Sequence, residues 1–208
     1  APPAYLFVVD VCLIEEELGA LKQSLTQALS LLPENASVGL ITFGTHVHVH
    51  ELGFDECPKS YVFRGSKEFT SQQIQDQLFR SAGGARPAKP GQAAAASTGH
   101  QSKFLVPLAD CEFQLTSVLE ELSRDSFSAL PDCRPARCTG TAVSVAATLL
   151  ASSVSNTPAR ALLFVGGPAT DGGGQVVGKE LETAMRSHKD IAKGAAPFMA
   201  KATKYYET

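Results

Sequence analysis

Residues 5–10 read Tyr-Leu-Phe-Val-Val-Asp. An unbroken run of apolar β-formers predicts a strand that is buried on both faces, as in a parallel sheet covered by helices. Asp10 ends this strand, and the glutamates at 15–17 then place negative charge where the N-terminus of a helix favours it. Leucines and alanines at helical spacing between Leu18 and Leu32 predict that this helix has one apolar face.

The alternation of strand and helix continues along the chain. We expect further strands at 38–43, 47–52 and 160–165, and helices at 70–80, 115–122, 140–152 and 198–206. Buried strands that alternate with helices are typical of an α/β fold, here a doubly wound, mostly parallel sheet with helices on both faces. The length of 208 residues predicts a single domain, 1–208, with a low-complexity surface insert at about 81–102.

Composition argues against several classes of protein. The net charge of −3 disfavours a nucleic-acid-binding domain, which is usually strongly basic. The apolar runs are far shorter than the roughly 20 residues that span a bilayer, and the first ten residues lack the positive start of a signal peptide. The five cysteines form no Cys-x-x-Cys pair, which favours reduced thiols in the cytosol over a disulfide framework.

Motifs for catalysis or cofactor binding are incomplete. The glycine-rich stretch 166–174 matches neither a phosphate-binding loop nor a dinucleotide fingerprint, so we expect a turn between a strand and a helix. Cys12 is the one candidate nucleophile, but the carboxylates at Asp10 and 15–17 would raise the pKa of its thiol and suppress the thiolate. We therefore assign no catalytic or cofactor-binding residue and do not expect this segment to be an enzyme.

Three histidines alternate at His46, His48 and His50, so a strand would present them on one face. Imidazoles in this arrangement could hold Zn²⁺ or Cu²⁺ adventitiously. A solvated strand face, with the intervening valines toward the core, is the favoured interpretation.

An apolar strand that ends in aspartate and leads into a helix resembles the start of a von Willebrand factor A domain. There an Asp-x-Ser-x-Ser motif surrounds Mg²⁺, but here the run from Asp10 reads Asp-Val-Cys-Leu-Ile. Thr141 matches a later hydroxyl ligand, whereas Gly166 stands where a second aspartate is expected. Because Mg²⁺ prefers oxygen ligands, we expect a degenerate metal site at Asp10 and Thr141 that holds no metal.

Seven blocks, in one order, resemble the trunk domain of the Sec twenty-three family, the GTPase-activating subunit of the COPII inner coat. They are residues 5–10, 15–18, 30–33, 38–44, 49–53, 59–65 and 164–170. The resemblance implies a von Willebrand A-like trunk without a working metal site. It also implies that the sheet continues beyond these residues, so we expect a fold that is incomplete at the C-terminus, with an open sheet edge.

The resemblance further implies a component of the COPII vesicle coat in transport from the endoplasmic reticulum to the Golgi apparatus. Its expected partners are the Sec twenty-four family cargo adaptor, a Sar-type small GTPase and outer-coat subunits. Its expected location is the cytoplasm, peripheral on the cytosolic face of endoplasmic reticulum exit sites and COPII vesicles. Zinc is expected only in an upstream zinc finger of the full-length protein, and the arginine finger for GTPase activation only in a downstream helical domain.

Tyr61, Phe63 and Arg64 are the candidate partner-binding residues, since aromatic residues and arginine are enriched at interface centres. The alternative is that Tyr61 and Phe63 face the core of the sheet. Two other functions stay open: a metal-dependent von Willebrand A-type protein-binding domain, and the trunk of the paralogous cargo adaptor.

Overall fold

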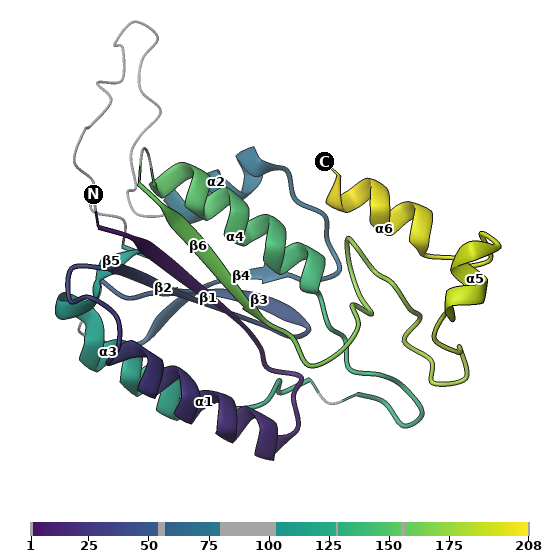
Figure 1. Cartoon of the computed structure of the whole chain (residues 1–208), viewed down its shortest axis with the longest axis horizontal. Coiled ribbons are helices and arrows are strands. Elements are labelled where there is room, and N and C mark those ends of the chain that lie inside the picture. The colour runs from purple at the N-terminus through teal and green to yellow at the C-terminus, as the bar shows by residue number, and fades with distance from the viewer. Residues whose placement is uncertain (1, 54–56, 80–102, 128, 155–156, 208) are drawn as a thin grey trace, which may run out of the picture.

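The computed structural model describes residues 2–53, 57–79, 103–127, 129–154 and 157–207. Its centre is a six-stranded sheet in the order β4-β3-β2-β1-β6, with the short β5 beside β2 (Figure 1). The strands are β1 (Ala4–Asp10), β2 (Ser37–Phe43), β3 (His46–Glu51), β4 (Lys59–Arg64), β5 (Val106–Pro107) and β6 (Ala159–Phe164). β1 is parallel to β2 and β6, whereas β3 is antiparallel to both β2 and β4. The sheet is therefore mixed, with its parallel pairs at β1.

Helices cover both faces of the sheet. The helices of the described chain are α1 (Glu15–Leu29), α2 (Ser71–Phe79), α3 (Leu108–Glu121), α4 (Thr139–Ser153), α5 (His188–Ala192) and α6 (Met199–Tyr206), of which the first four cover the sheet. α1 and α3 pack on one face, and α2 and α4 on the other, as Figure 1 shows. The predicted α/β class with helices on both faces is confirmed.

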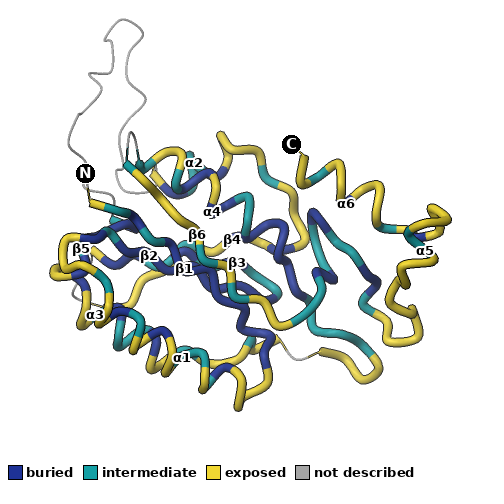
Figure 2. The backbone as a smooth tube through the Cα atoms, in the orientation of Figure 1, coloured by how far each residue is buried: buried dark blue, intermediate teal, exposed yellow. Residues whose placement is uncertain are grey.

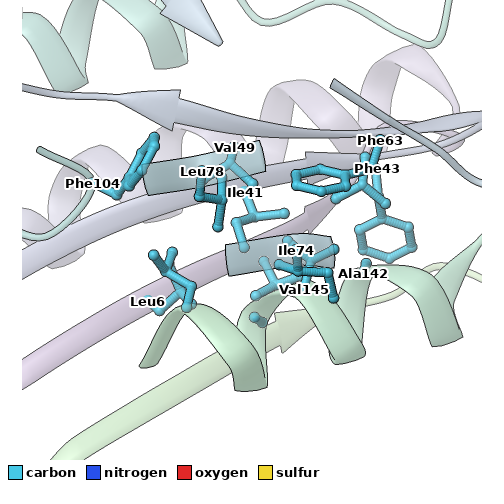
Figure 3. Packing of buried hydrophobic residues seen from close by; sticks show 14 of the residues in the cluster. Leu6, Ile41, Phe43, Val49, Phe63, Ile74, Leu78, Phe104, Ala142 and Val145 are labelled. Atoms are coloured by element: carbon cyan, nitrogen blue, oxygen red, sulfur yellow. The ribbon is translucent and has the colours of Figure 1, made fainter. Parts of the chain in front are cut away.

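β1 is buried on both sides because its residues alternate between two cores. Leu6 and Val8 belong to the cluster under α2 and α4, whereas Phe7 and Val9 belong to the cluster under α1 and α3. Figure 3 shows the first cluster, in which side chains of the sheet meet those of α2 and α4. Figure 2 shows that burial concentrates in the central strands, while α5 and α6 are largely exposed. The run at 5–10 therefore forms the buried strand that its composition predicts.

β6 is an outer strand of the described sheet, and it pairs only with β1 there. Leu163 and Val165 remain 45% and 42% exposed on and just beyond this strand. An apolar strand with a free edge is a surface that other polypeptide can cover.

Some element boundaries differ from the sequence-based predictions. The helix predicted around 115–122 begins earlier, at Leu108, directly after Pro107, and the first helix ends at Leu29 rather than near Leu32. The prediction that 166–174 joins a strand to a helix is wrong, because the chain stays irregular until α5 begins at His188. Gly172 and Gly174 have positive φ there, which continues a turn rather than starting a helix. The predicted insert at 81–102 lies outside the described residues.

Within the part of the chain that the structure describes, none of the helices combines the length and apolar character required to cross a bilayer.

Candidate functional site at the carboxyl end of the sheet

Asp10 is the last residue of β1 and is fully buried. Its Oδ1 accepts a hydrogen bond of 2.7 Å from the backbone N–H of Cys12, and its Oδ2 accepts one of 3.0 Å from that of Gly166. Gly166 follows β6, so this carboxylate joins the ends of two neighbouring parallel strands. A buried charge of this kind is stable only if it is paired.

The paired charge is Arg137, which precedes α4. Its Nε donates to Asp10 Oδ2 at 2.6 Å, and the two side chains are 7% and 0% exposed. Nη1 lies 3.4 Å from the carbonyl oxygen of Pro168, and Nη2 lies 3.5 Å from that of Cys12. Arg137 is not among the residues predicted from the sequence, because it lies 127 residues from Asp10 and carries no local motif.

Backbone hydrogen bonds hold Arg137 in place. Its N–H donates to Thr170 Oγ1 at 2.8 Å, and its carbonyl accepts from the N–H of Thr170 at 3.1 Å. The Thr170 hydroxyl in turn donates to the carbonyl of Pro135 at 2.5 Å. The segment 135–137 and the loop after β6 therefore form one unit with the end of β1.

The hydroxyl of Thr141, the second residue of the predicted degenerate metal site, does not bond to Asp10. It donates to the carbonyl of Gly65 at 2.8 Å and is 2% exposed. Both Asp10 oxygens are likewise used by protein groups. The donor set therefore does not fit Mg²⁺, because the carboxylate already has a cationic partner and the side chains of Cys12 and Ile14 offer no oxygen. Among the described residues, no group of three or more His, Cys, Asp or Glu side chains could hold a metal ion.

Cys12 is a poor nucleophile in this setting. Burial, followed by the nearby Asp10 charge, raises the pKa of the thiol to about 12, and the opposing effect of Arg137 is smaller. The predicted suppression of the thiolate is thus confirmed. The pKa is raised by burial, by Asp10 and, less strongly, by Asp125, and the glutamates at 15–17 are not among the causes.

The three histidines lie on one face of β3, as predicted. His46, His48 and His50 are half-buried, while the intervening valines are fully buried on the other face. They line a cleft of about 320 Å³ beneath the C-terminal end of α3 and the loop at 122–126. Burial lowers the pKa of His48, with a further contribution from His46, and burial lowers that of His50 to about 4, so that His50 is neutral at pH 7.

Of the three candidate partner-binding residues, Phe63 is a core residue. It is 0% exposed and packs edge-on against Phe69, with ring centroids 5.4 Å apart. The prediction that Phe63 contacts a partner is therefore wrong, because a strand alternates its side chains and position 63 points inward. Tyr61 is half-buried, whereas Arg64 is exposed on the outer strand β4.

Comparison with known proteins places the chain in a family. The Sec23/Sec24 trunk domain profile matches residues 1–208. The chain is 48% identical over 211 residues to "Protein transport protein SEC23 F" of Arabidopsis thaliana, and the match covers 100% of this chain and 27% of the relative. It thus spans about a quarter of that relative's length.

A solved structure supports the fold alone. The crystal structure of the human COPII-coat protein Sec24c superimposes with a TM-score of 0.51, 16% identity, and coverage of 79% of this chain and 19% of that one. With a family profile matched along its whole length and a relative almost half identical to it, the chain belongs to the Sec23/Sec24 trunk-domain family.

Proposed function

We propose that this chain is the trunk of a Sec23-type coat protein, a component of the COPII vesicle coat in transport from the endoplasmic reticulum to the Golgi apparatus. The observation that carries this proposal is the 48% identity to a SEC23 protein over the whole chain. In this function the trunk scaffolds the inner coat and contacts both the cargo adaptor and a Sar-type GTPase. It acts on the cytosolic face of exit sites, where outer-coat subunits then assemble.

The chain supplies binding surface rather than chemistry. Its buried thiol at Cys12 is held protonated, and its buried arginine at 137 is committed to Asp10. An arginine finger must reach a transferring phosphoryl group, and Arg137 cannot do so while it is buried in this ion pair. GTPase activation is therefore proposed for the full-length protein, with zinc in a separate zinc finger.

The proposed partner surface is the outer strand β4 around Tyr61. Lys103 Nζ donates to the Tyr61 hydroxyl at 2.5 Å and lies 4.2 Å from the ring centroid, and Lys59 Nζ lies 5.6 Å from the same centroid. Both lysines also form ion pairs with Glu51 Oε2, Lys59 Nζ at 3.2 Å and Lys103 Nζ at 3.5 Å. These contacts fix the tyrosine ring before any partner binds, which lowers the entropy lost on binding.

The exposed part of β4 is basic and partly apolar. Val62, which is 44% exposed, and Arg64, which is exposed, project from the face of β4 opposite to Tyr61, so both faces of this outer strand contribute to the surface. Among the described residues, the carboxylate that pairs with these lysines is Glu51, which is almost fully buried. The surface therefore suits a partner that presents an acidic side chain beside an apolar one.

A binding experiment tests the function and the surface together. The 208-residue chain is mixed separately with purified cargo-adaptor trunk and with the GTP-locked Sar-type GTPase, and GTP hydrolysis is followed in parallel. We expect binding without stimulated hydrolysis. Absence of binding by a folded chain would overturn the proposed scaffold, and stimulated hydrolysis would overturn the assignment of the arginine finger to another part of the protein.

Variants locate the surface. Arg64→Glu should weaken binding about tenfold or more and leave the melting temperature unchanged, because Arg64 is exposed. Lys193→Glu, an exposed charge reversal just after α5 and away from the sheet, is the matched control and should bind normally. Equal binding by both variants would place the partner elsewhere while leaving the coat function intact.

A further inference from the structure

We infer that Arg137 is the resident cation of the site at Asp10. Its guanidinium takes the role that the von Willebrand A resemblance implies for a divalent metal, so the native chain needs no exchangeable cation at this end of the sheet. The inference rests on the groups that surround the guanidinium and on the glycines that leave it room.

The acceptors around the guanidinium are all oxygens. They are Asp10 Oδ2 at 2.6 Å and the carbonyls of Pro168 and Cys12 at 3.4 Å and 3.5 Å. One carboxylate and two carbonyls, from the end of β1 and the loop after β6, resemble the oxygen shell that suits a hard cation. Here N–H groups fill that shell, and the separations are those of hydrogen bonds and longer polar contacts rather than of metal ligation.

The two glycines after β6 make room for this arrangement. A Cβ at position 167 would lie only 2.5 Å from Arg137 Nη1. At position 166 a Cβ would meet the side chain of Leu13, and it would stand 3.7 Å from Asp10 Oδ2. At the position where a metal-binding domain would carry a second aspartate, a side chain would therefore require Leu13 to move. The absence of a Cβ at position 167 leaves the space that the Arg137 guanidinium occupies.

Covalent attachment distinguishes this cation from a metal ion. The guanidinium is part of the chain, and the backbone N–H and carbonyl of Arg137 are both hydrogen-bonded to Thr170. The positive charge therefore cannot dissociate from the protein as a metal ion can. A metal site has loaded and empty states, whereas this one has a single state. The loop after β6 and the segment before α4 are consequently held against β1 whatever the concentration of free divalent ions.

The wild-type chain provides the first test. A ligand that binds the native state raises the melting temperature by mass action, so we expect no change in melting temperature between millimolar MgCl₂ and EDTA. A rise in Mg²⁺ that EDTA reverses would overturn the inference, and this arm requires no variant to fold.

Chemical rescue provides the second test. Arg137→Ala leaves a buried carboxylate without its partner, and we expect its melting temperature to fall by on the order of 10 °C. Methylguanidinium at millimolar concentration should restore part of this loss, and equimolar methylurea, which is neutral, should not. The double variant Asp10→Asn/Arg137→Ala should not respond to methylguanidinium, because the carboxylate is gone.

Arg137→Gln, which removes the charge but keeps most of the volume, replaces the alanine variant if the latter does not fold. We expect it to melt well below wild type, whereas the exposed control Arg160→Gln should melt like wild type. A melting temperature of Arg137→Gln equal to wild type, or equal responses to methylguanidinium and methylurea, would show that Arg137 is not the resident cation.

Discussion

His50 Nε2 lies 3.0 Å from the hydroxyl of Thr42, across the pair of strands β3 and β2. His48 stands on the same face of β3, and its charge, if present, would oppose protonation of His50. Burial is the larger effect, and together they lower the pKa of His50 to about 4. A buried neutral histidine makes folding stability depend on pH.

Acid should destabilise the chain through His50. The ordinary pKa of 6.5 applies to the unfolded chain, so between pH 6.5 and about 4 the unfolded state binds more protons than the folded one. The stabilisation is fully present above pH 6.5 and is lost as the pH falls through that window, by about 3 kcal/mol. Urea unfolding at pH 7, 5 and 4 measures it. The dependence of the unfolding free energy on pH should become weaker in His50→Gln and should stay unchanged in the exposed control His188→Gln.

Phe63→Ala should unfold the core rather than remove a contact surface. Truncating a fully buried phenylalanine costs about 3–5 kcal/mol, so we expect a large fall in melting temperature and loss of partner binding together. Circular dichroism melts and the pull-down measure both quantities. Unchanged stability with lost binding would instead return Phe63 to the partner surface.

Thr141→Val should destabilise the chain by about 1–3 kcal/mol, because the buried carbonyl of Gly65 loses its hydroxyl donor. Thr141→Ser keeps the hydroxyl and should recover most of the loss. Chemical denaturation compares the two variants, with the exposed Thr203→Val as control. If the serine variant were as unstable as the valine variant, packing of the methyl group would be the main contribution of Thr141.

The thiols should react in an order set by exposure and charge. Cys57 is exposed, whereas burial raises the pKa of Cys12 and Cys138 to about 12 and that of Cys111 to about 11. At pH 8, with a thiol reagent, we expect the fastest reaction at Cys57, a slower one at the partly exposed Cys133, the slowest at the buried thiols, and loss of the fastest phase in Cys57→Ser. A fast phase that survives in this variant would show that another thiol is accessible.

Gly167→Ala should disturb the guanidinium of Arg137, which stands where the new Cβ would point. Overpacking of this kind typically costs about 1–3 kcal/mol. A double-mutant cycle with Arg137→Ala isolates the effect, since the alanine at 167 should cost less once the guanidinium is gone. Additive losses would mean that the two residues do not interact.

Local patterns in the sequence predict most of the elements. The run at 5–10 becomes β1 because its apolar residues can be buried on two faces, and the alternating histidines lie on one face of β3 because a strand repeats every two residues. Element ends are less well predicted. α3 begins at Leu108 because Pro107 ends the preceding strand, a boundary that hydrophobic periodicity does not mark.

Some features of the candidate site can likewise be predicted from the sequence, whereas others require the folded structure. The missing oxygens after Asp10 and the glycine at 166 can be read from the sequence, and they predict a degenerate metal site. The inward direction of Phe63 requires the register of β4 against β3, which pairs Phe63 with the buried Val47. Interface composition alone does not distinguish such a residue from Arg64.

The buried strand β1, the α/β class and the loss of metal ligands follow from the amino-acid sequence alone, because they depend on residue type and on short-range periodicity. The cation that stands beside Asp10 in place of a metal ion becomes visible only in the folded chain. Arg137 meets Asp10 across 127 residues of chain, where the ends of β1 and β6 converge on the segment before α4. An ion pair of that separation has no local pattern, since its geometry exists only once the sheet has brought its strand ends together.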